Sequence, residues 1–194
     1  NGLPVASGFI ADTNILLSGH PTKVPYVIKP NNEGSSVGVN IILDESENLS
    51  SIQERLPKFV LIEEFIPGRE LTVTVMDDKP LAITEIITAD WYDYNAKYRV
   101  GGSKHILPAL VPDEIRDACY SYALTAHTAL GCRGVTRVDF RWNELKEIEG
   151  LVILELNTQP GMTTTSLVPE QAKHSGISFQ DLCKWIVEDA SCLR

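Results

Sequence analysis

The sequence predicts an α+β fold with largely antiparallel sheets. Two strand–turn–strand patterns, at residues 26–43 and 70–87, indicate hairpins, and two separate patterns, at 113–130 and 178–190, indicate helices. Hairpins join antiparallel strands, and a mixture of hairpins and helices is typical of α+β proteins.

The first half of the chain consists of short apolar runs separated by turns. Leu49, Ile52 and Leu56 recur at steps of three and four residues, which predicts a helix after the capping residues Asp44 and Ser46. The expected elements are a short helix at 12–18, strands at 26–28 and 39–43, a helix at 44–56 and a buried strand at 59–62.

The second half begins after a turn at Pro67-Gly68, which we take as the boundary between two lobes, residues 1–66 and 67–194. Alternating side chains predict its strands, and an apolar stripe that ends at Gly131 predicts its longest helix. Ser178 begins a capping box, which marks the last helix. The expected elements are strands at 70–76, 81–87, 135–141 and 151–156 and helices at 113–130 and 178–190.

Charge and composition restrict the function. The chain has 194 residues, with 17 lysines and arginines against 26 aspartates and glutamates, and a net charge of −9. This balance argues against a nucleic-acid partner, because phosphate backbones are bound by basic surfaces. No apolar run is long enough to span a bilayer, so we expect no membrane partner. The four cysteines lack metal-site spacing and are expected to be reduced. Because the chain starts in a turn without methionine, we expect it to be part of a longer polypeptide.

A glycine- and serine-rich loop joins the first two expected strands. Its sequence at residues 33–38 is EGSSVG, and Lys29 stands at the end of the preceding strand. Glycines let backbone N–H groups converge on an anion, and a lysine supplies charge for a phosphate. The alternative interpretation is an ordinary hairpin turn.

Acidic residues follow the expected buried strand at 59–62. Glu63 and Glu64 end that strand, and Glu70 comes after the turn. Such a strand end offers backbone N–H and C=O groups to an adenine edge, and the later carboxylate can accept hydrogen bonds from ribose hydroxyls. The alternative is that these acidic residues are solvated strand ends.

The strongest candidate site is a polar face of two later strands. Alternation places Arg137 and Asp139 on one face of the first strand, and Glu155 and Asn157 on one face of the second. If these strands are neighbours, two carboxylates and an amide oxygen converge within roughly 5 Å. Hard oxygen ligands of this kind suit Mg²⁺. The alternative is an exposed sheet face on which Arg137 pairs with Asp139.

Two other segments carry more polar or aromatic side chains than a connection needs. Residues 158–169 form a hydroxyl-rich loop before a helix that we expect to start at Pro169, and the positive end of that helix, near Ser166, would suit a substrate carboxylate. Residues 88–108 hold several aromatic side chains and a glycine pair without periodicity. Loops of this length are usually functional.

Six motifs, taken in order, make the sequence similar to the D-alanine–D-alanine ligases of the ATP-grasp superfamily. They are Lys29, EGSSVG, EEFIPGRE, YDYNAKY, RVDF and ELNTQPGMT, and they extend over essentially the whole chain. The resemblance implies an ATP-grasp fold, in which two α+β lobes with largely antiparallel sheets sandwich the nucleotide. It also implies an N-terminal substrate lobe, which would precede Asn1.

The resemblance implies roles for individual residues. The implied contacts to ATP are Lys29, Ser36, Glu63, Phe65, Ile66, Glu70 and Lys97. The implied ligands of two Mg²⁺ or Mn²⁺ ions are Asp139, Glu155 and Asn157. The implied catalytic groups are Arg137 and Gly161, which stabilise the reacting phosphoryl and acyl centres, and Ser35 and Tyr98, which position substrates. The implied contacts to the second D-alanine are Ser166 and Leu167.

By this resemblance the protein is an ATP-dependent enzyme that joins two D-alanines for peptidoglycan precursors in the bacterial cytoplasm. Tyr98 favours the dipeptide over products made from D-lactate, and residues 88–103 would form a lid. The implied partners are D-alanine, ATP and, for the full-length protein, a second copy. The alternatives are another ATP-grasp carboxylate–amine ligase, such as a glutathione-synthetase-like enzyme, and an inactive ATP-binding lobe that needs the missing N-terminal part.

Overall fold

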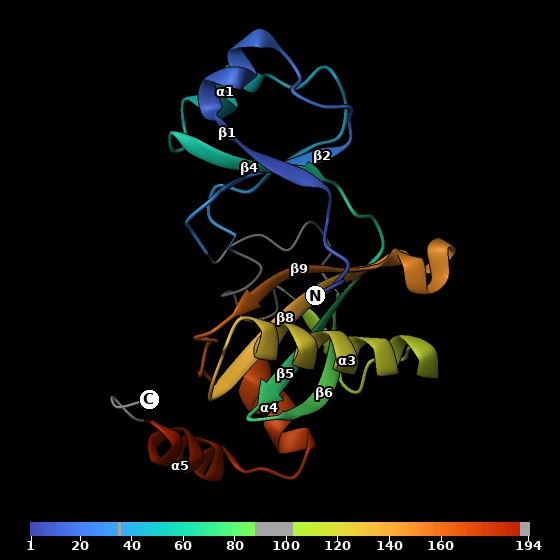
Figure 1. Cartoon of the computed structure of the whole chain (residues 1–194), viewed down its shortest axis with the longest axis vertical. Coiled ribbons are helices and arrows are strands. Elements are labelled where there is room, and N and C mark those ends of the chain that lie inside the picture. Colours follow the sequence, from blue (N-terminus) through green and yellow to red (C-terminus); the bar gives the residue numbers. More distant parts are fainter. Residues whose placement is uncertain (35, 88–102, 191–194) are drawn as a thin grey trace. The chain divides into compact units, whose positions relative to one another are not determined.

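The structure is a computed structural model that describes residues 1–34, 36–87 and 103–190 (Figure 1). The chain divides into two compact units. Unit 1 comprises Asn1–Val5, Pro67–Ile87 and Lys104–Arg194, and unit 2 comprises Ala6–Ile66 and Thr88–Ser103. The predicted division into two lobes, residues 1–66 and 67–194, stays a prediction. Within the described ranges, no helix has the length and apolar character needed to cross a membrane.

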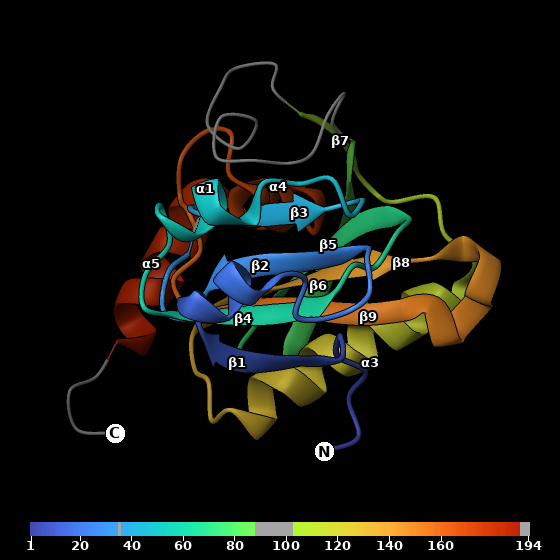
Figure 2. The same ribbon diagram turned by 90° about the horizontal axis from the view of Figure 1, so that it is seen from above.

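Unit 2 contains a four-stranded antiparallel sheet in the order β1-β4-β2-β3 (Figure 2). Its strands are β1 (Gly8–Asp12), β2 (Tyr26–Pro30), β3 (Asn40–Ile42) and β4 (Phe59–Glu64). The pairing of β2 with β3 confirms the hairpin predicted at 26–43. Strand β1 was not predicted. Gly8 permits its close approach to β4, because a Cβ atom there would lie 2.7 Å from the carbonyl oxygen of Ile62.

Two short helical segments pack on one face of the unit 2 sheet, the 3₁₀ helix η1 (Thr13–Ser18) and the helix α1 (Leu49–Gln53). The prediction of a helix over 44–56 is wrong at both ends. Asp44 Oδ1 accepts a hydrogen bond from the Ser46 amide at 2.8 Å and closes a turn, and Asn48 caps α1 instead. The buried cluster of this unit consists of Leu16, Tyr26, Ile28, Ile42, Leu49, Ile52, Val60 and Ile62.

The strand β4 was predicted to be buried at residues 59–62, and this is correct for one of its two faces only. Its residues alternate between the core and the opposite face, so that Val60 and Ile62 are fully buried whereas Phe59 is 52% exposed. The strand β4 pairs with β1 on one side and with β2 on the other. The segments η1 and α1 cover the face of the sheet that carries Val60 and Ile62. The opposite face carries the side chains of Lys29 and Glu63.

Unit 1 contains a five-stranded antiparallel sheet in the order β7-β6-β5-β8-β9. Its strands are β5 (Arg69–Met76), β6 (Lys79–Ile87), β7 (Lys104–Ile106), β8 (Val135–Trp142) and β9 (Leu151–Asn157). The β5–β6 hairpin confirms the pattern at 70–87. The short strand β7 lies in the segment for which the sequence showed no periodicity.

Helices cover both faces of the unit 1 sheet. The helix α3 (Asp113–Ala129) packs on the apolar face, where Leu71, Val73, Val138 and Phe140 form the core. The helices α4 (Leu167–His174) and α5 (Phe179–Asp189) pack around Val135 at one end of the opposite face. The 3₁₀ segment η2 (Glu144–Gly150) connects β8 to β9. The helix after the hydroxyl-rich loop therefore begins at Leu167, two residues before the predicted start.

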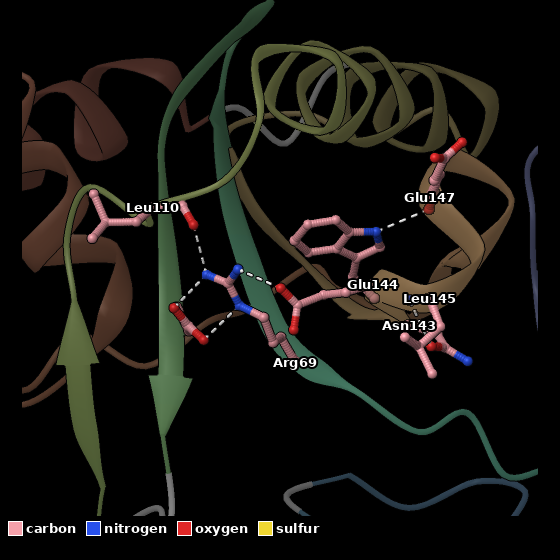
Figure 3. Close-up of polar contacts among 8 residues, drawn as sticks. Arg69, Leu110, Asn143, Glu144, Leu145 and Glu147 are labelled. Carbon is pink, nitrogen blue, oxygen red and sulfur yellow. Dashed lines mark hydrogen bonds and ion pairs between the residues drawn. The ribbon is translucent and has the colours of Figure 1, made fainter.

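One arginine links the first residue of β5 to three other segments (Figure 3). Arg69 Nε and Nη2 donate to the two carboxylate oxygens of Glu85 at 2.7 and 2.6 Å. Nη2 also donates to the carbonyl of Leu110 at 2.8 Å, and Nη1 to Glu144 at 3.3 Å. The guanidinium lies 5.2 Å from the ring centroid of Trp142. These contacts fix the strand at the point where it begins.

Candidate active site

The polar side chains of unit 1 gather on one face of its sheet, which we call the polar face. In β5 every second residue points to it, and the residues of β8 and β9 directly opposite share it. The side chains on this face are Glu70, Thr72, Thr74, Arg137, Asp139, Arg141, Glu155 and Asn157. The apolar residues between them point to α3. The convergence that alternation predicted for β8 and β9 is confirmed.

Asp139 lies at the centre of the polar face and is 6% exposed. Its Oδ1 atom accepts hydrogen bonds from Thr72 Oγ1 at 2.7 Å and from Arg137 Nε at 2.8 Å. Its Oδ2 atom accepts from Arg137 Nη2 at 2.7 Å. The pairing of Arg137 with Asp139, which the sequence left open as an alternative, is therefore present, and it fixes both the carboxylate and the guanidinium.

Asn157 and Glu155 complete the group. The Asn157 Nδ2 atom donates to Asp139 Oδ2 and to Glu155 Oε1, both at 3.2 Å. Glu155 lies directly opposite Asp139, and Asn157 lies opposite Arg137. The strand β9 has a bulge at Leu154, because Asp139 lies opposite Glu155 but the next residue, Phe140, lies opposite Ile153. The side chain of Glu155 is exposed, so the group opens to solvent on this side.

The oxygen atoms of this group fit a divalent cation. Asp139 and Glu155 each offer carboxylate oxygens. The Asn157 NH₂ group lies between the two carboxylates, where both would also attract a cation. Turning that amide by half a rotation presents its oxygen to the same place. Within the described parts of the chain, no group of three or more histidines, cysteines, aspartates and glutamates could hold a metal ion. The assignment as ligands stays a prediction.

Glu70 and Arg141 lie at one end of the polar face and are directly opposite each other. Arg141 Nη1 is 3.4 Å from Glu70 Oε2. Burial lowers the pKa of the Arg141 guanidinium, and the charge of Glu70 opposes this shift. The pair holds the Glu70 carboxylate on the same face as Asp139.

The loop after Asn157 ends at the N-terminus of α4. Ser166 is the N-cap residue, but its hydroxyl does not cap the helix. Instead Ser166 Oγ accepts a hydrogen bond from the Thr163 amide at 2.9 Å. A Cβ atom at Gly161 would lie 2.8 Å from Ser166 Oγ, so a side chain there would displace the Ser166 hydroxyl. Leu167 is 5% exposed and anchors the first turn of α4 in the core.

In unit 2, Lys29 and Glu63 share the sheet face that is turned away from the core. Lys29 Nζ is 2.5 Å from Glu63 Oε1. The glycine-rich loop before β3 is tightly turned, since Ser36 has φ +58° and Gly38 has φ +70°. The Phe65 amide donates to the carbonyl of Pro25 at 3.4 Å, which ties the strand end to β2.

Three of the predicted site residues, Ser35, Lys97 and Tyr98, lie outside the described residues. The predicted lid at 88–103 also lies outside them, apart from Ser103. Sequence reasoning missed two residues, Thr72 and Gln171. The alternation of β5 could have placed Thr72 on the face of Glu70, but no local signal marks Gln171.

Comparisons with known proteins agree on one family. A family model described as "D-ala D-ala ligase C-terminus" matches residues 18–188. The D-alanine--D-alanine ligase of Ruegeria sp. (strain TM1040) is 55% identical over 193 residues, which cover 100% of this chain and 63% of that relative. The chain thus spans less than two thirds of the length of such curated relatives.

Solved structures show the same likeness. The D-alanine--D-alanine ligase from Bacillus anthracis has a TM-score of 0.78 at 30% identity, over 97% of this chain and 62% of its own. Its complex with ATP has a TM-score of 0.73 at 29% identity, over 97% and 61%. The VanG D-Ala:D-Ser ligase from Enterococcus faecalis has a TM-score of 0.76 at 26% identity, over 96% and 57%. These likenesses confirm the expected α+β ATP-grasp fold.

Proposed function

The chain belongs to the D-ala D-ala ligase C-terminus family, and we propose that it forms the ATP- and metal-binding part of an enzyme that joins two D-alanines. The observation that supports this most is the group of Asp139, Glu155 and Asn157 beside Arg137 on the polar face. Phosphoryl transfer depends on positioning and on neutralising charge, and this group supplies oxygen ligands next to a fixed cation.

The proposed reaction has two steps. A carboxylate is a poor electrophile, so an oxygen of the first D-alanine attacks the γ-phosphorus of ATP, ADP leaves, and an acyl phosphate forms. The amine of the second D-alanine then attacks the acyl carbon, a proton is lost from the nitrogen, and inorganic phosphate leaves. Both steps build negative charge on oxygen atoms, which the site must stabilise.

The residues of the polar face are suited to this stabilisation. The Arg137 guanidinium is held by two hydrogen bonds from Nε and Nη2 to Asp139, so it faces a developing oxyanion without first having to reorganise. The Gly161 backbone is proposed as a second stabilising group. Held by Asp139, Glu155 and Asn157, two Mg²⁺ or Mn²⁺ ions would supply further charge neutralisation for the phosphates.

The proposed contacts to ATP are those that the family resemblance implies. Lys29, Ser36 and Lys97 would bind the phosphates. Glu63 and the backbone of Phe65 and Ile66 would meet the adenine, and Glu70 would accept hydrogen bonds from the ribose. The ion pairs of Lys29 with Glu63 and of Arg141 with Glu70 support these roles, because they hold both carboxylates in fixed orientations.

The proposed substrate contacts are Ser166 and Leu167 for the carboxylate of the second D-alanine and Ser35 and Tyr98 for positioning. Residues 88–103 would close over the site and keep water from the acyl phosphate. We further propose that the product serves peptidoglycan precursor synthesis in the bacterial cytoplasm, and that the full-length protein is a homodimer.

A second candidate function is the ligation of D-alanine to another D-amino acid. The likeness to a D-Ala:D-Ser ligase, with a TM-score of 0.76, favours this alternative over unrelated carboxylate–amine ligases. A third candidate is a lobe that binds ATP but needs a further part of the protein for turnover.

The test is ATP-dependent phosphate release by the complete natural protein with D-alanine, D-serine, D-lactate and L-alanine. We expect release that depends on D-alanine and a dipeptide product that mass spectrometry identifies. Glu155→Gln is expected to abolish it, whereas the matched exposed substitution Glu149→Gln is expected to leave it unchanged. The proposal is wrong if D-alanine causes no release, and ATP binding without turnover would favour the third candidate.

A further inference from the structure

Thr72 holds the central carboxylate of the polar face from the neighbouring strand. It lies directly opposite Asp139, is fully buried, and donates its hydroxyl hydrogen to Asp139 Oδ1 over 2.7 Å. Threonine is stiff at χ1, because two heavy atoms branch from its Cβ. An aspartate, in contrast, rotates broadly about its terminal torsion. The Thr72 hydroxyl therefore defines which carboxylate oxygen of Asp139 points into the sheet.

The two oxygens of Asp139 have different surroundings. Oδ1 accepts from the buried Thr72 and from Arg137 Nε, at 2.7 and 2.8 Å. Oδ2 accepts from Arg137 Nη2 at 2.7 Å and, at the longer distance of 3.2 Å, from the Asn157 amide that also contacts Glu155. A cation that replaces this amide hydrogen bond would meet Oδ2. Oδ1 is therefore the more firmly held atom, and Oδ2 is the oxygen that would contact a bound cation.

Thr72 is itself held in place by a glutamine from α4. Gln171 is fully buried, and its amide donates to the carbonyl of Thr72 at 3.2 Å and to Thr84 Oγ1 at 3.0 Å. Its Oε1 atom accepts from the Thr74 amide at 2.7 Å. The Gln171 side chain thus pairs with the β5 backbone as a neighbouring strand would.

The need for this glutamine follows from an irregularity in the sheet. Val73 pairs with Ile83, but Val75 pairs with Pro80, so β6 has one residue more than β5 between these pairs. The backbone groups of β5 at this bulge need another partner, and Gln171 supplies one. The helix that carries Ser166 and Leu167 at its start is therefore joined to the strand that orients Asp139.

We propose that Thr72 is a positioning residue that fixes Asp139 for cation binding and that Gln171 holds Thr72 in register from α4. This proposal rests on the proposed function, since it assigns a ligand atom within the same site. Groups that orient metal ligands typically contribute about 10- to 100-fold to metal affinity.

Three substitutions separate positioning from packing. Thr72→Val removes the hydroxyl and nearly preserves the shape, and Thr72→Ser keeps the hydroxyl. Thr74→Val is the matched control, because Thr74 lies on the same strand and face and is equally buried. In the described part of the chain, its Oγ1 is a buried polar atom without a hydrogen-bond partner.

The measurement is the affinity of the full chain for Mn²⁺ in the presence of ADP, by calorimetry and by electron paramagnetic resonance. We expect Thr72→Val to weaken Mn²⁺ binding by about 10-fold or more, Thr72→Ser to weaken it less than Thr72→Val does, and Thr74→Val to stay within about twofold of the unsubstituted protein. Urea unfolding of the same variants, without metal, reports their folding.

Two results would overturn the proposal. If Thr72→Val binds Mn²⁺ as the unsubstituted protein does while Glu155→Gln does not bind it, Thr72 has no positioning role but the metal site stands. If the unsubstituted protein itself binds no Mn²⁺, both the positioning role and the metal assignment are wrong. Should Thr72→Val fail to fold, Thr72→Ala decides by the same measurement.

Discussion

Arg69 and Glu85 are joined by two parallel hydrogen bonds, of 2.7 and 2.6 Å, at the residue where β5 begins. Both side chains are mostly buried, and the pair is also in contact with the Leu110 carbonyl. Breaking a buried ion pair from one side leaves the other charge without compensation. We expect Arg69→Met to lower the free energy of unfolding by about 1.5–3 kcal/mol, measured by urea denaturation.

The matched control for that experiment is Arg116→Met. Arg116 also contacts two carboxylates, those of Asp113 and Asp117, but it does so on the exposed side of α3. Exposed ion pairs contribute little, because water screens them. The prediction for Arg69 is contradicted if the two substitutions lower stability equally.

Glu155 and Asp139 are expected to respond differently to loss of their charge in the metal-free protein. Glu155 lies opposite Asp139 and carries a like charge. Glu155→Gln is therefore expected to raise the free energy of unfolding by about 0.5 kcal/mol. Asp139→Asn removes the partner of Arg137 and is expected to lower stability by more than 1 kcal/mol. Thermal unfolding in EDTA measures both, and a gain in stability for Asp139→Asn would contradict the account of the ion pair.

Gly68, in the turn before β5, is expected to tolerate no side chain. It has φ +110°, and a Cβ atom there would lie 2.1 Å from the carbonyl oxygen of Trp142. Gly131, after α3, has φ +62° but no atom within 4 Å of the same position. We expect Gly131→Ala to cost about 1–2 kcal/mol from backbone strain alone, and Gly68→Ala to cost more. If denaturant unfolding shows that both substitutions lower the free energy of unfolding equally, the structure relieves the clash at residue 68 and the prediction is wrong.

His127 is expected to make the stability of unit 1 depend on pH. Its side chain is 5% exposed, with Nδ1 2.8 Å from Thr136 Oγ1. Burial lowers the pKa of His127 below its ordinary value of 6.5, and Asp77 and the Cys132 backbone oppose this shift. Below pH 6.5 the unfolded chain therefore binds a proton that the folded chain does not, so stability falls as the pH falls from 6.5 to the folded pKa.

Above pH 6.5 His127 is neutral in both states and contributes no pH dependence. His127→Asn is expected to reduce the loss of stability between neutral pH and pH 5.5, measured by urea unfolding at each pH. An unchanged slope in this variant would show that another group is responsible.

Cys119 is expected to resist alkylation in the folded protein. Its side chain is fully buried in α3, and burial raises the pKa of the thiol to about 12. Because the thiolate is the nucleophile, almost none is present at pH 8. Mass spectrometry after iodoacetamide treatment should find Cys183, which is half-buried, modified before Cys119. Early modification of Cys119 would contradict its packing role.

Local patterns in the sequence were sufficient for the elements that bury one regular stripe or face. Alternation in residues 135–141 and 151–157 placed Arg137, Asp139, Glu155 and Asn157 correctly on one face, because strand geometry leaves a side chain only two directions. The hairpins were predictable for the same reason, and α3 was predictable from its apolar stripe, which follows the helical period. The proposed roles of these residues come from the family resemblance, which rests on ordered motifs, and they stay predictions.

Which side chains of a strand share a face can be read from the amino-acid sequence, since the backbone repeat is a local property. Which residues meet across that face depends on how the strands pair in the folded chain. The pairing of β5 with β8 places Thr72 against Asp139, and the bulge between β5 and β6 creates the site that Gln171 fills. Strand order and bulges depend on contacts between residues far apart in the chain, such as Thr72 and Gln171, which are 99 positions apart, and no local period records them.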